Sequence, residues 1–343
     1  MLRRITKLLT SLLTLIGIPA SAQVTGGSST FNQLIERANT GDVEAQVELG
    51  CCYFDGNGVI QDYEQAINWW TQAANQGNAI AENNLGVCYE GGKGVEKNKE
   101  QAVLWYNKAA QQGNAMAQNN LGVCYESGNG VMVDKGLAVY WYTKAATQGY
   151  DVAQYNLGCC YEKGVGLPID NEQAVYWYTK AAEQGQISAQ YNLGICYKKG
   201  NGVNQDISQT VFWWTQAANS GDAKSQKSLG YCYFYGEGVS KNNKKAVYWW
   251  SKAAEQGVAE AQYELGVCYR AGDGVEQDDN QAIYWYTKAA EQGVADAQFN
   301  LGCVFYDGIG VEKNVEQAVY WWTLAAKQGH ADAQRNLRII RGY

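Results

Sequence analysis

A glycine recurs every 36 residues along this chain without any shift of register. The recurring glycines are Gly41, Gly77, Gly113, Gly149, Gly185, Gly221, Gly257, Gly293 and Gly329. A period between about 20 and 50 residues is typical of a solenoid, in which each repeat buries its apolar face only by stacking on its neighbours. The pattern therefore predicts a stacked array rather than one globular core.

Each repeat contains the signals of two helices separated by a glycine turn. Positions within a repeat are counted from its opening glycine, which is position 0. In residues 149–184, Ala153 and Leu157 lie on one helical face. Gly158 follows the leucine and leaves room for a partner helix to come close. Position 21 is Asp or Asn in all eight repeats, which is typical of a helix N-cap, and the next glycine ends the second helix. The predicted repeat is an αα-hairpin.

These residues resemble a known repeat family. The string Ala-x-Ala-Gln-x-x-Leu-Gly-x-x-Tyr-x-x-Gly-x-Gly-Val, then Asp, Ala, Trp-Tyr and Ala-Ala-x-Gln-Gly, resembles the Sel1-like repeat, a relative of the tetratricopeptide repeat with a longer turn. The match covers residues 41–329. The resemblance implies an all-α fold, a right-handed α/α superhelix whose first helices line the concave side. It also implies an adaptor that binds other proteins.

The predicted solenoid has eight helix-turn-helix repeats and a cap at each end. The repeats are residues 41–76, 77–112, 113–148, 149–184, 185–220, 221–256, 257–292 and 293–328, together 41–328. Residues 31–40 are predicted to form a lone second helix that caps the first repeat, and residues 329–343 a C-terminal capping helix. Residues 23–30 are a short Gly/Ser-rich lead that we expect to be flexible.

Residues 1–22 have the pattern of a secretory signal peptide. Arg3, Arg4 and Lys7 precede an apolar run, and small residues follow it at 20–22. The apolar run is too short to span a bilayer comfortably, so we expect no transmembrane anchor after cleavage. The sequence predicts an exported protein, and it leaves open whether the protein stays in the periplasm or is secreted.

The charge of the cleaved chain restricts the class of partner. Removal of residues 1–22 leaves 24 Lys plus Arg against 34 Asp plus Glu, a net charge of −10. A chain this acidic is a poor candidate for binding nucleic acid or an anionic membrane. We therefore expect a protein or peptide partner, with peptidoglycan contact as a second option.

The ten cysteines all fall at positions 10 and 11, on the predicted first helices. Equivalent residues of stacked helices lie roughly 8–10 Å apart, whereas a disulfide needs Cα atoms about 4.4–6.8 Å apart. We expect free thiols that serve as small apolar core residues. Some exported relatives of this family are cysteine-rich and bridge the two helices of each repeat. Here the second helices carry Ala-Ala where such a cysteine would sit.

A stripe at positions 6, 10 and 13 of the first helices lies away from the core positions, and position 7 lies beside it. If the first helices line the concave side, this stripe is a groove with aromatic side chains and amide edges. The candidate binding residues are Tyr155, Tyr191, Tyr263, Phe299, Asn84, Asn120, Asn156, Asn192 and Asn300. An asparagine amide donates and accepts, so it can hold a peptide backbone or a terminal carboxylate. The alternative is that these asparagines brace the repeats.

The second helices carry two aromatic positions. Position 28 is Trp in every repeat and is predicted to pack helix against helix. Position 27 points about 180° away from that core, and its aromatic members are Tyr140, Tyr176, Phe212, Tyr248, Tyr284 and Tyr320. An outward aromatic row is a candidate binding patch, although packing between repeats could absorb it equally well.

Catalytic signals are weak. The only histidine, His330, falls in the C-terminal cap, where a solvent-exposed helix start is the favoured interpretation. No Ser-x-x-Lys occurs, and the cysteines lack the CxxC clustering of zinc sites. We expect no catalytic residue, metal or cofactor, and a scaffold that binds proteins through its groove. The alternatives are an envelope hydrolase of the β-lactamase or penicillin-binding type, which cysteine-rich relatives imply, and a peptidoglycan or glycan binder.

Overall fold

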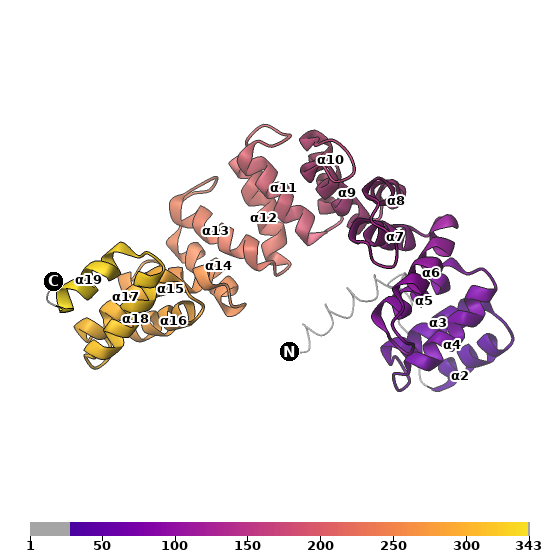
Figure 1. Ribbon diagram of the computed structural model, residues 1–343, viewed down its shortest axis with the longest axis horizontal. Helices are drawn as coiled ribbons and strands as arrows, with labels where there is room; N and C mark the ends of the chain where they lie inside the picture. Colours follow the sequence, from indigo (N-terminus) through magenta and orange to yellow (C-terminus); the bar gives the residue numbers. More distant parts are fainter. Residues whose placement is uncertain (1–27, 342–343) are drawn as a thin grey trace. The chain divides into compact units, whose positions relative to one another are not determined.

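The computed structural model describes residues 28–341, which form eighteen α-helices and no strand (Figure 1). The all-α prediction is therefore confirmed. The predicted signal peptide, residues 1–22, lies outside the described residues, as does most of the predicted lead. The chain divides into two compact units, one ending at Gln184 and the other starting at Gly185.

The first unit contains a capping helix and four helical pairs. Its helices are α2 (Ser28–Asn39), α3 (Val43–Asp55), α4 (Tyr63–Asn75), α5 (Ala79–Gly91), α6 (Lys99–Gln111), α7 (Ala115–Ser127), α8 (Lys135–Thr147), α9 (Asp151–Lys163) and α10 (Asn171–Glu183). Helices α3, α5, α7 and α9 are the first helices of their repeats. Each packs against the second helix of its own repeat, and within the unit that second helix packs against the next first helix.

The second unit mirrors this arrangement, with four helical pairs and a capping helix at its end. Its helices are α11 (Ile187–Lys199), α12 (Ile207–Asn219), α13 (Ala223–Tyr235), α14 (Asn243–Glu255), α15 (Ala259–Ala271), α16 (Asp279–Glu291), α17 (Ala295–Asp307), α18 (Val315–Lys327) and α19 (Ala331–Arg341). The first helices are α11, α13, α15 and α17. The same sequential packing joins the helices, so consecutive hairpins stack as a solenoid requires.

Capping side chains set where the helices begin. Every second helix has the predicted Asp or Asn at its N-cap, and in α10 the Asp170 carboxylate accepts from the backbone N–H of Gln173 at 3.0 Å. Most first helices are capped in the same way at position 1, as by Asn114 in α7. Three first helices have no side-chain cap, because position 1 is Tyr150, Val258 or Val294.

The core of each repeat forms where a glycine on the first helix meets an aromatic ring on the second. A Cβ built on Gly158 would lie 2.7 Å from Cδ1 of Tyr178, so the predicted close approach is confirmed. The ring involved is at position 29, one residue after the tryptophan that the sequence suggested. Position 29 is buried in every repeat, whereas the position 28 tryptophans are mostly half-buried and pack at the edge of the core clusters.

A buried glutamine bracket joins successive repeats. Gln118, at position 5, donates from Nε2 to the carbonyl of Ala110 in the preceding repeat at 3.1 Å. Its Oε1 accepts from Nε2 of Gln148, at the end of its own repeat, at 2.7 Å. The same pair of bonds recurs around Gln46, Gln154, Gln226, Gln262 and Gln298. Since each bracket holds three segments together, it fixes how one hairpin sits on the next.

The caps and cysteines complete the apolar interior. Helix α2 begins at Ser28, so the helix starts within the segment expected to be a flexible lead, and its Leu34 and Ala38 pack against Leu49 and Cys52. The ten cysteines are free thiols and eight of them are buried, which confirms their prediction as core residues. At the other end, Leu337 of α19 packs with Trp322.

His330 is a correction to the sequence interpretation. The residue does lie at the start of α19, where its Nδ1 accepts from the backbone N–H of Ala333 at 3.3 Å. Its side chain is only 14% exposed, however, because the ring stacks on Phe299 with 4.4 Å between ring centroids and Nε2 lies 3.3 Å from Asp296. The histidine therefore closes the end of the last repeat instead of facing solvent.

Candidate functional site

The four aromatic candidates on the first helices pack against aromatic rings of the core. Tyr155 lies 5.9 Å from Tyr178 between ring centroids, Tyr191 stacks on Trp214 at 6.1 Å, and Tyr263 lies 6.1 Å from Tyr286. Phe299 stacks on His330. All four are half-buried. Each ring therefore has one side committed to the core, and only its remaining surface is open to a partner.

Several of the candidate asparagines form hydrogen bonds to the preceding repeat, as the bracing alternative expects. Asn120 donates to Oδ1 of Asn83 in the preceding repeat at 3.1 Å, and Asn156 donates to Oδ1 of Asn119 at 2.9 Å. In the second unit, burial raises the pKa of the Tyr263 phenol, and hydrogen bonding with Asn300 opposes that rise. Asn192 is half-buried. These bonds join first helices of neighbouring repeats within each unit.

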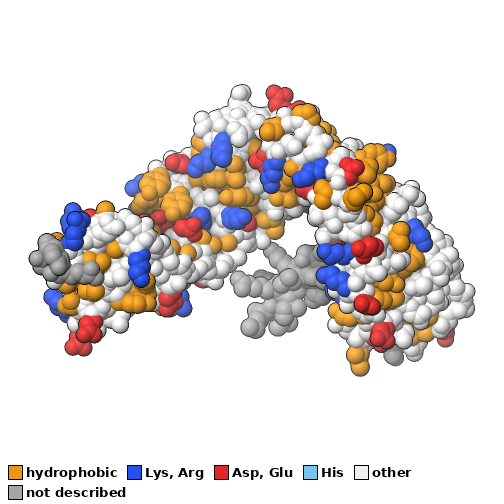
Figure 2. Space-filling view, viewed as in Figure 1, with side chains coloured by type: hydrophobic (Ala, Val, Ile, Leu, Met, Phe, Trp, Pro, Cys, Tyr) orange, Lys and Arg blue, Asp and Glu red, His pale blue; other side chains and the backbone are white. Residues whose placement is uncertain are grey.

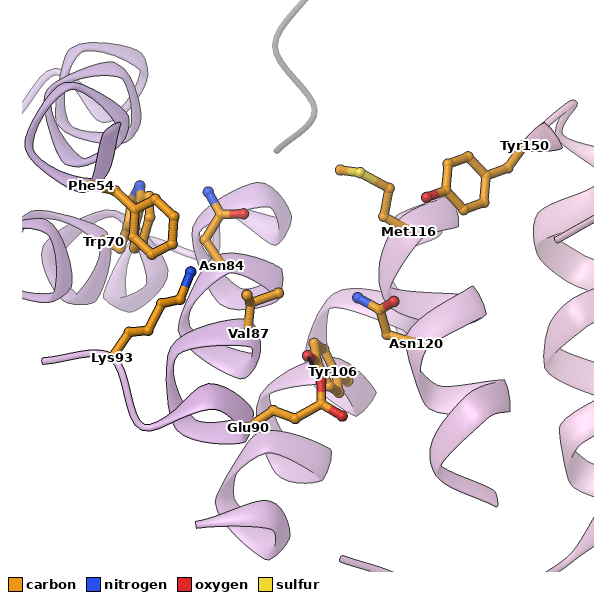
Figure 3. Close-up of a pocket in the computed structure, with 10 residues that line it drawn as sticks. All are labelled: Phe54, Trp70, Asn84, Val87, Glu90, Lys93, Tyr106, Met116, Asn120 and Tyr150. Atoms are coloured by element: carbon orange, nitrogen blue, oxygen red, sulfur yellow. Dashed lines mark hydrogen bonds between the residues drawn. The ribbon is translucent and has the colours of Figure 1, made fainter. Parts of the chain in front are cut away.

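Two candidate asparagines nevertheless meet at a cleft in the first unit. The cleft has a volume of about 260 Å³, and its lining residues come from repeats one to four. Asn84 and Val87 come from α5, Met116 and Asn120 from α7, and Tyr150 from the start of α9 (Figure 3). The other lining residues are Phe54, Trp70, Glu90, Lys93 and Tyr106. The structure thus brings Asn84 and Asn120 together, but none of the four predicted aromatic residues lines this cleft.

A second hollow, of about 290 Å³, lies in the second unit near α19. It is lined by Tyr306, Trp322, Asn336 and Ile339, together with Cys303, Asp307 and Ile340. Tyr306 and Trp322 occupy positions 13 and 29 of their repeat, and Asn336 and Ile339 occupy positions 7 and 10 of the segment that follows. Phe54, Trp70, Asn84 and Val87 hold the same positions in the first cleft. Both hollows therefore form at the same step between two repeats.

The recurring glutamates of the first helices accept hydrogen bonds from the second helices. Glu90, Glu126 and Glu162 each accept a hydrogen bond of 2.7 Å from a buried tyrosine hydroxyl of the paired second helix. Burial raises the pKa of Tyr106, Tyr142 and Tyr178 strongly, and the glutamates add to the rise. A sequence signal exists, because position 13 is Glu only in repeats whose position 29 is Tyr.

The aromatic row on the second helices is half exposed. Tyr140, Tyr176, Phe212, Tyr248, Tyr284 and Tyr320 are between 49% and 54% exposed. Each ring meets the following tryptophan edge to face, as Tyr140 meets Trp141 with 5.0 Å between centroids. A lysine one turn later reaches over several of the rings, as Lys252 does over Tyr248 at 5.4 Å. Packing onto the tryptophan absorbs part of each ring, and the rest faces solvent.

Charged side chains of both signs are interspersed on the face that Figure 2 shows. Among residues 28–341, no group of three or more His, Cys, Asp or Glu side chains is placed to hold a metal ion. No helix in that part of the chain is long and apolar enough to cross a membrane.

The helical pairs described above match a known family of repeat proteins. The family model of the Sel1 repeat matches residues 43–78, 79–114, 115–150, 151–186, 187–222, 223–258, 259–294 and 295–330. The chain belongs to the Sel1 repeat family. Sel1 repeat folds generally mediate protein–protein interaction and are generally non-catalytic scaffolds.

Solved structures that resemble this Sel1 repeat protein include two from bacteria. One is a protective antigen of uropathogenic Escherichia coli strains with an SLR fold, 42% identical with a TM-score of 0.85 over 90% of this chain and 66% of the antigen. The other is a Sel1 repeat protein from Oxalobacter formigenes, 31% identical with a TM-score of 0.66 over 95% of this chain and 99% of that one.

A curated relative is the secretory immunoglobulin A-binding protein EsiB of Escherichia coli. It is 41% identical over 62 residues, which are 18% of this chain and 12% of EsiB. The Sel1 repeat protein therefore spans just under two thirds of the antigen's length, and it matches only a short part of EsiB.

Proposed function

We propose that this Sel1 repeat protein is exported and holds a protein partner on the face of its first helices. The observation that carries the proposal is that both units have a hollow at the same step between repeats, with aromatic and amide groups at equivalent positions. Preformed hollows on stacked helices lose little conformational freedom on binding. The leader pattern of residues 1–22 and the names of the relatives, an antigen and an immunoglobulin-binding protein, support export.

A second candidate function rests on the other face. Half-exposed rings follow one another on the second helices of each unit, two in the first and four in the second, and such rings can stack on the sugar rings of peptidoglycan. The first-helix face is favoured, because its hollows combine apolar walls with hydrogen-bonding groups, the composition of a specific site.

Photo-crosslinking distinguishes the two faces. We expect a benzoylphenylalanine at Val123 or Val267, both at position 10 of first helices, to trap the same protein in the cell of origin. The matched positions Tyr140 and Tyr284 on second helices should trap none. Mass spectrometry of the adducts is the measurement. A protein or glycan trapped only from Tyr140 and Tyr284 would move the binding face to the aromatic row.

A further inference from the structure

The cleft of the first unit contains a buried hydrogen-bond donor without an acceptor. Asn84 is 3% exposed, and its Nδ2 has no hydrogen-bond partner. Its Oδ1 accepts only a long bond, 3.4 Å, from Nδ2 of Asn83. A buried polar group left unsatisfied costs about 1–3 kcal/mol. A ligand atom that accepted a hydrogen bond from this donor would therefore remove that cost, and this would favour binding.

The repeat register explains why Asn84 is left in this state. Asn120 and Asn156, at the same position of the next two repeats, donate to asparagines 37 residues earlier in the chain. The residue 37 before Asn84 is Val47, whose side chain has no acceptor. The asparagine amide that joins neighbouring repeats later in the chain is therefore a donor without an acceptor in this repeat.

Most of the residues that line the cleft around this donor are apolar or aromatic. Figure 3 shows Asn84 between Phe54 and Val87, with Met116 and Tyr150 facing it from the other side. Tyr150 occupies the N-cap of α9 and makes no capping bond, although a cap is worth about 1 kcal/mol. Local rules tend to be broken at functional sites. Helix α9 has no capping side chain, and the aromatic ring of Tyr150 at that position lines the cleft instead.

The two charged side chains that line the cleft, Lys93 and Glu90, have opposite signs. The Lys93 ammonium lies 4.6 Å from the centre of the Phe54 ring. Burial raises the pKa of the neighbouring Asp55, and Lys93 opposes that rise. Glu90 accepts the hydroxyl of Tyr106. Because the lining contains one cation, Lys93, and one anion, Glu90, its formal charges cancel and the complementary occupant is uncharged.

We propose that this cleft binds an extended segment of a protein partner through one large apolar, uncharged side chain, with a backbone carbonyl of that segment accepting a hydrogen bond from Nδ2 of Asn84. The inference rests on the proposed function and names the chemistry of the segment recognised. Met116 and Lys93 have unbranched side chains that can move aside to admit the carbonyl.

Blocked tripeptides test the subsite directly. The probes are acetyl-Gly-X-Gly-amides in which X is Leu, Phe, Asp or Lys, titrated into the full chain labelled with ¹⁵N at asparagine. We expect the Leu and Phe peptides to shift the Asn84 side-chain amide signal saturably, and the Asp and Lys peptides not to. Asn84→Leu should weaken Leu-peptide binding at least about tenfold, because one hydrogen bond and the site for it are lost.

Thermal stability provides the readout that separates binding from structure. Asn84→Leu should raise Tm, because it removes an unsatisfied buried donor. The matched control Asn156→Leu should lower Tm, because it removes the bond to Asn119, and it should leave peptide binding unchanged.

Three results would each overturn the proposal: no saturable shift with the Leu or Phe peptide, equal affinity of Asn84→Leu, or preference for a charged peptide. If crosslinking from Val123 and Val267 still traps a partner in that case, the proposed function stands and only this subsite is lost. If both crosslinks are lost while the Leu and Phe peptides still bind, the subsite stands and the proposed function is wrong.

Discussion

At the residue scale, the glycine at position 9 sets the distance between the two helices of a repeat. Gly158 lies inside α9, where glycine ordinarily costs about 1 kcal/mol relative to alanine. The ring of Tyr178 occupies the space that a side chain would need. The same contact recurs at Gly86 with Tyr106 and at Gly230 with Trp250. Glycine is therefore needed at this position despite its cost, because any side chain there would overlap the ring.

Gly158→Ala tests this contact. The new methyl group would lie within 2.7 Å of Tyr178, so the helices must separate or the ring must leave its rotamer. Overpacking of this kind costs about 1–3 kcal/mol, and we expect a loss of about 2 kcal/mol in urea unfolding. Gly91→Ala is the control, because its nearest neighbour is a flexible lysine at 3.6 Å, and it should be neutral or stabilising. Equal effects of the two substitutions would contradict the packing argument.

At the element scale, the glutamine bracket is what makes one hairpin recognise the next. One exception shows how the bracket works. Position 5 of the second repeat is Glu82, which is 4% exposed and still accepts from Gln112 at 2.6 Å. Burial raises the pKa of Glu82, while Lys108 and Gln112 oppose the rise. An ionised carboxylate cannot donate, so the Ala74 carbonyl lacks the bond that glutamine supplies elsewhere.

Glu82→Gln should therefore stabilise the chain at pH 7 by about 1 kcal/mol, the typical net value of one hydrogen bond. The raised pKa gives the pH dependence its sign. Protonated Glu82 can donate, so the wild type gains stability as pH falls towards and below the ordinary glutamate value, and the advantage of the variant shrinks. Tm at pH 7 and pH 4 measures both effects. Gln118→Glu, the reciprocal control, should lose stability at pH 7 and recover part of it at pH 4.

At the scale of the whole molecule, the buried thiols link stability to alkaline pH. Burial raises the pKa of Cys52 and Cys232 to about 11 and that of Cys88 and Cys124 to about 12. An unfolded cysteine ionises near pH 8.5. Because the pKa is higher in the folded state, the stabilisation is complete below that value and is lost as pH rises towards the folded-state values.

We expect Tm to be constant between pH 7 and about 8.5 and then to fall steadily up to about pH 11. Circular dichroism melts across this range are the measurement. Cys88→Val keeps an apolar side chain but removes one titrating group, so its Tm should fall less steeply than that of the wild type. A flat Tm through pH 10.5 would show that the thiols are accessible to water in the folded chain.

Much of the fold was predictable because the same sequence signals recur in all eight repeats. The helices, the turn glycines, the position 21 caps and the burial of the cysteines all follow from local spacing. The position 28 tryptophans were predicted as packing residues, but the most buried ring is one residue later. That choice depends on which ring fits over Gly158, a contact between two helices that helical periodicity does not define.

The candidate site was harder to predict. Asn84 and Asn120 were identified from their position, but the cleft also needs Lys93, Met116 and Tyr150 from other positions of other repeats. The difference between a bracing asparagine and an open one depends on the side chain 37 residues earlier. That relation becomes visible only when the stacking register is known.

The glutamine bracket has a consequence for how such a gene can change. Its partners lie at fixed spacings within one hairpin and the hairpin before it, so excising or duplicating a block of 36 residues restores the bonds at the new junction wherever glutamine occupies both positions. Loss of a single residue inside a helix would instead put the bonds that span it out of register. Gain or loss of whole 36-residue repeats therefore preserves the stacking contacts, so this protein can change in length by complete repeats.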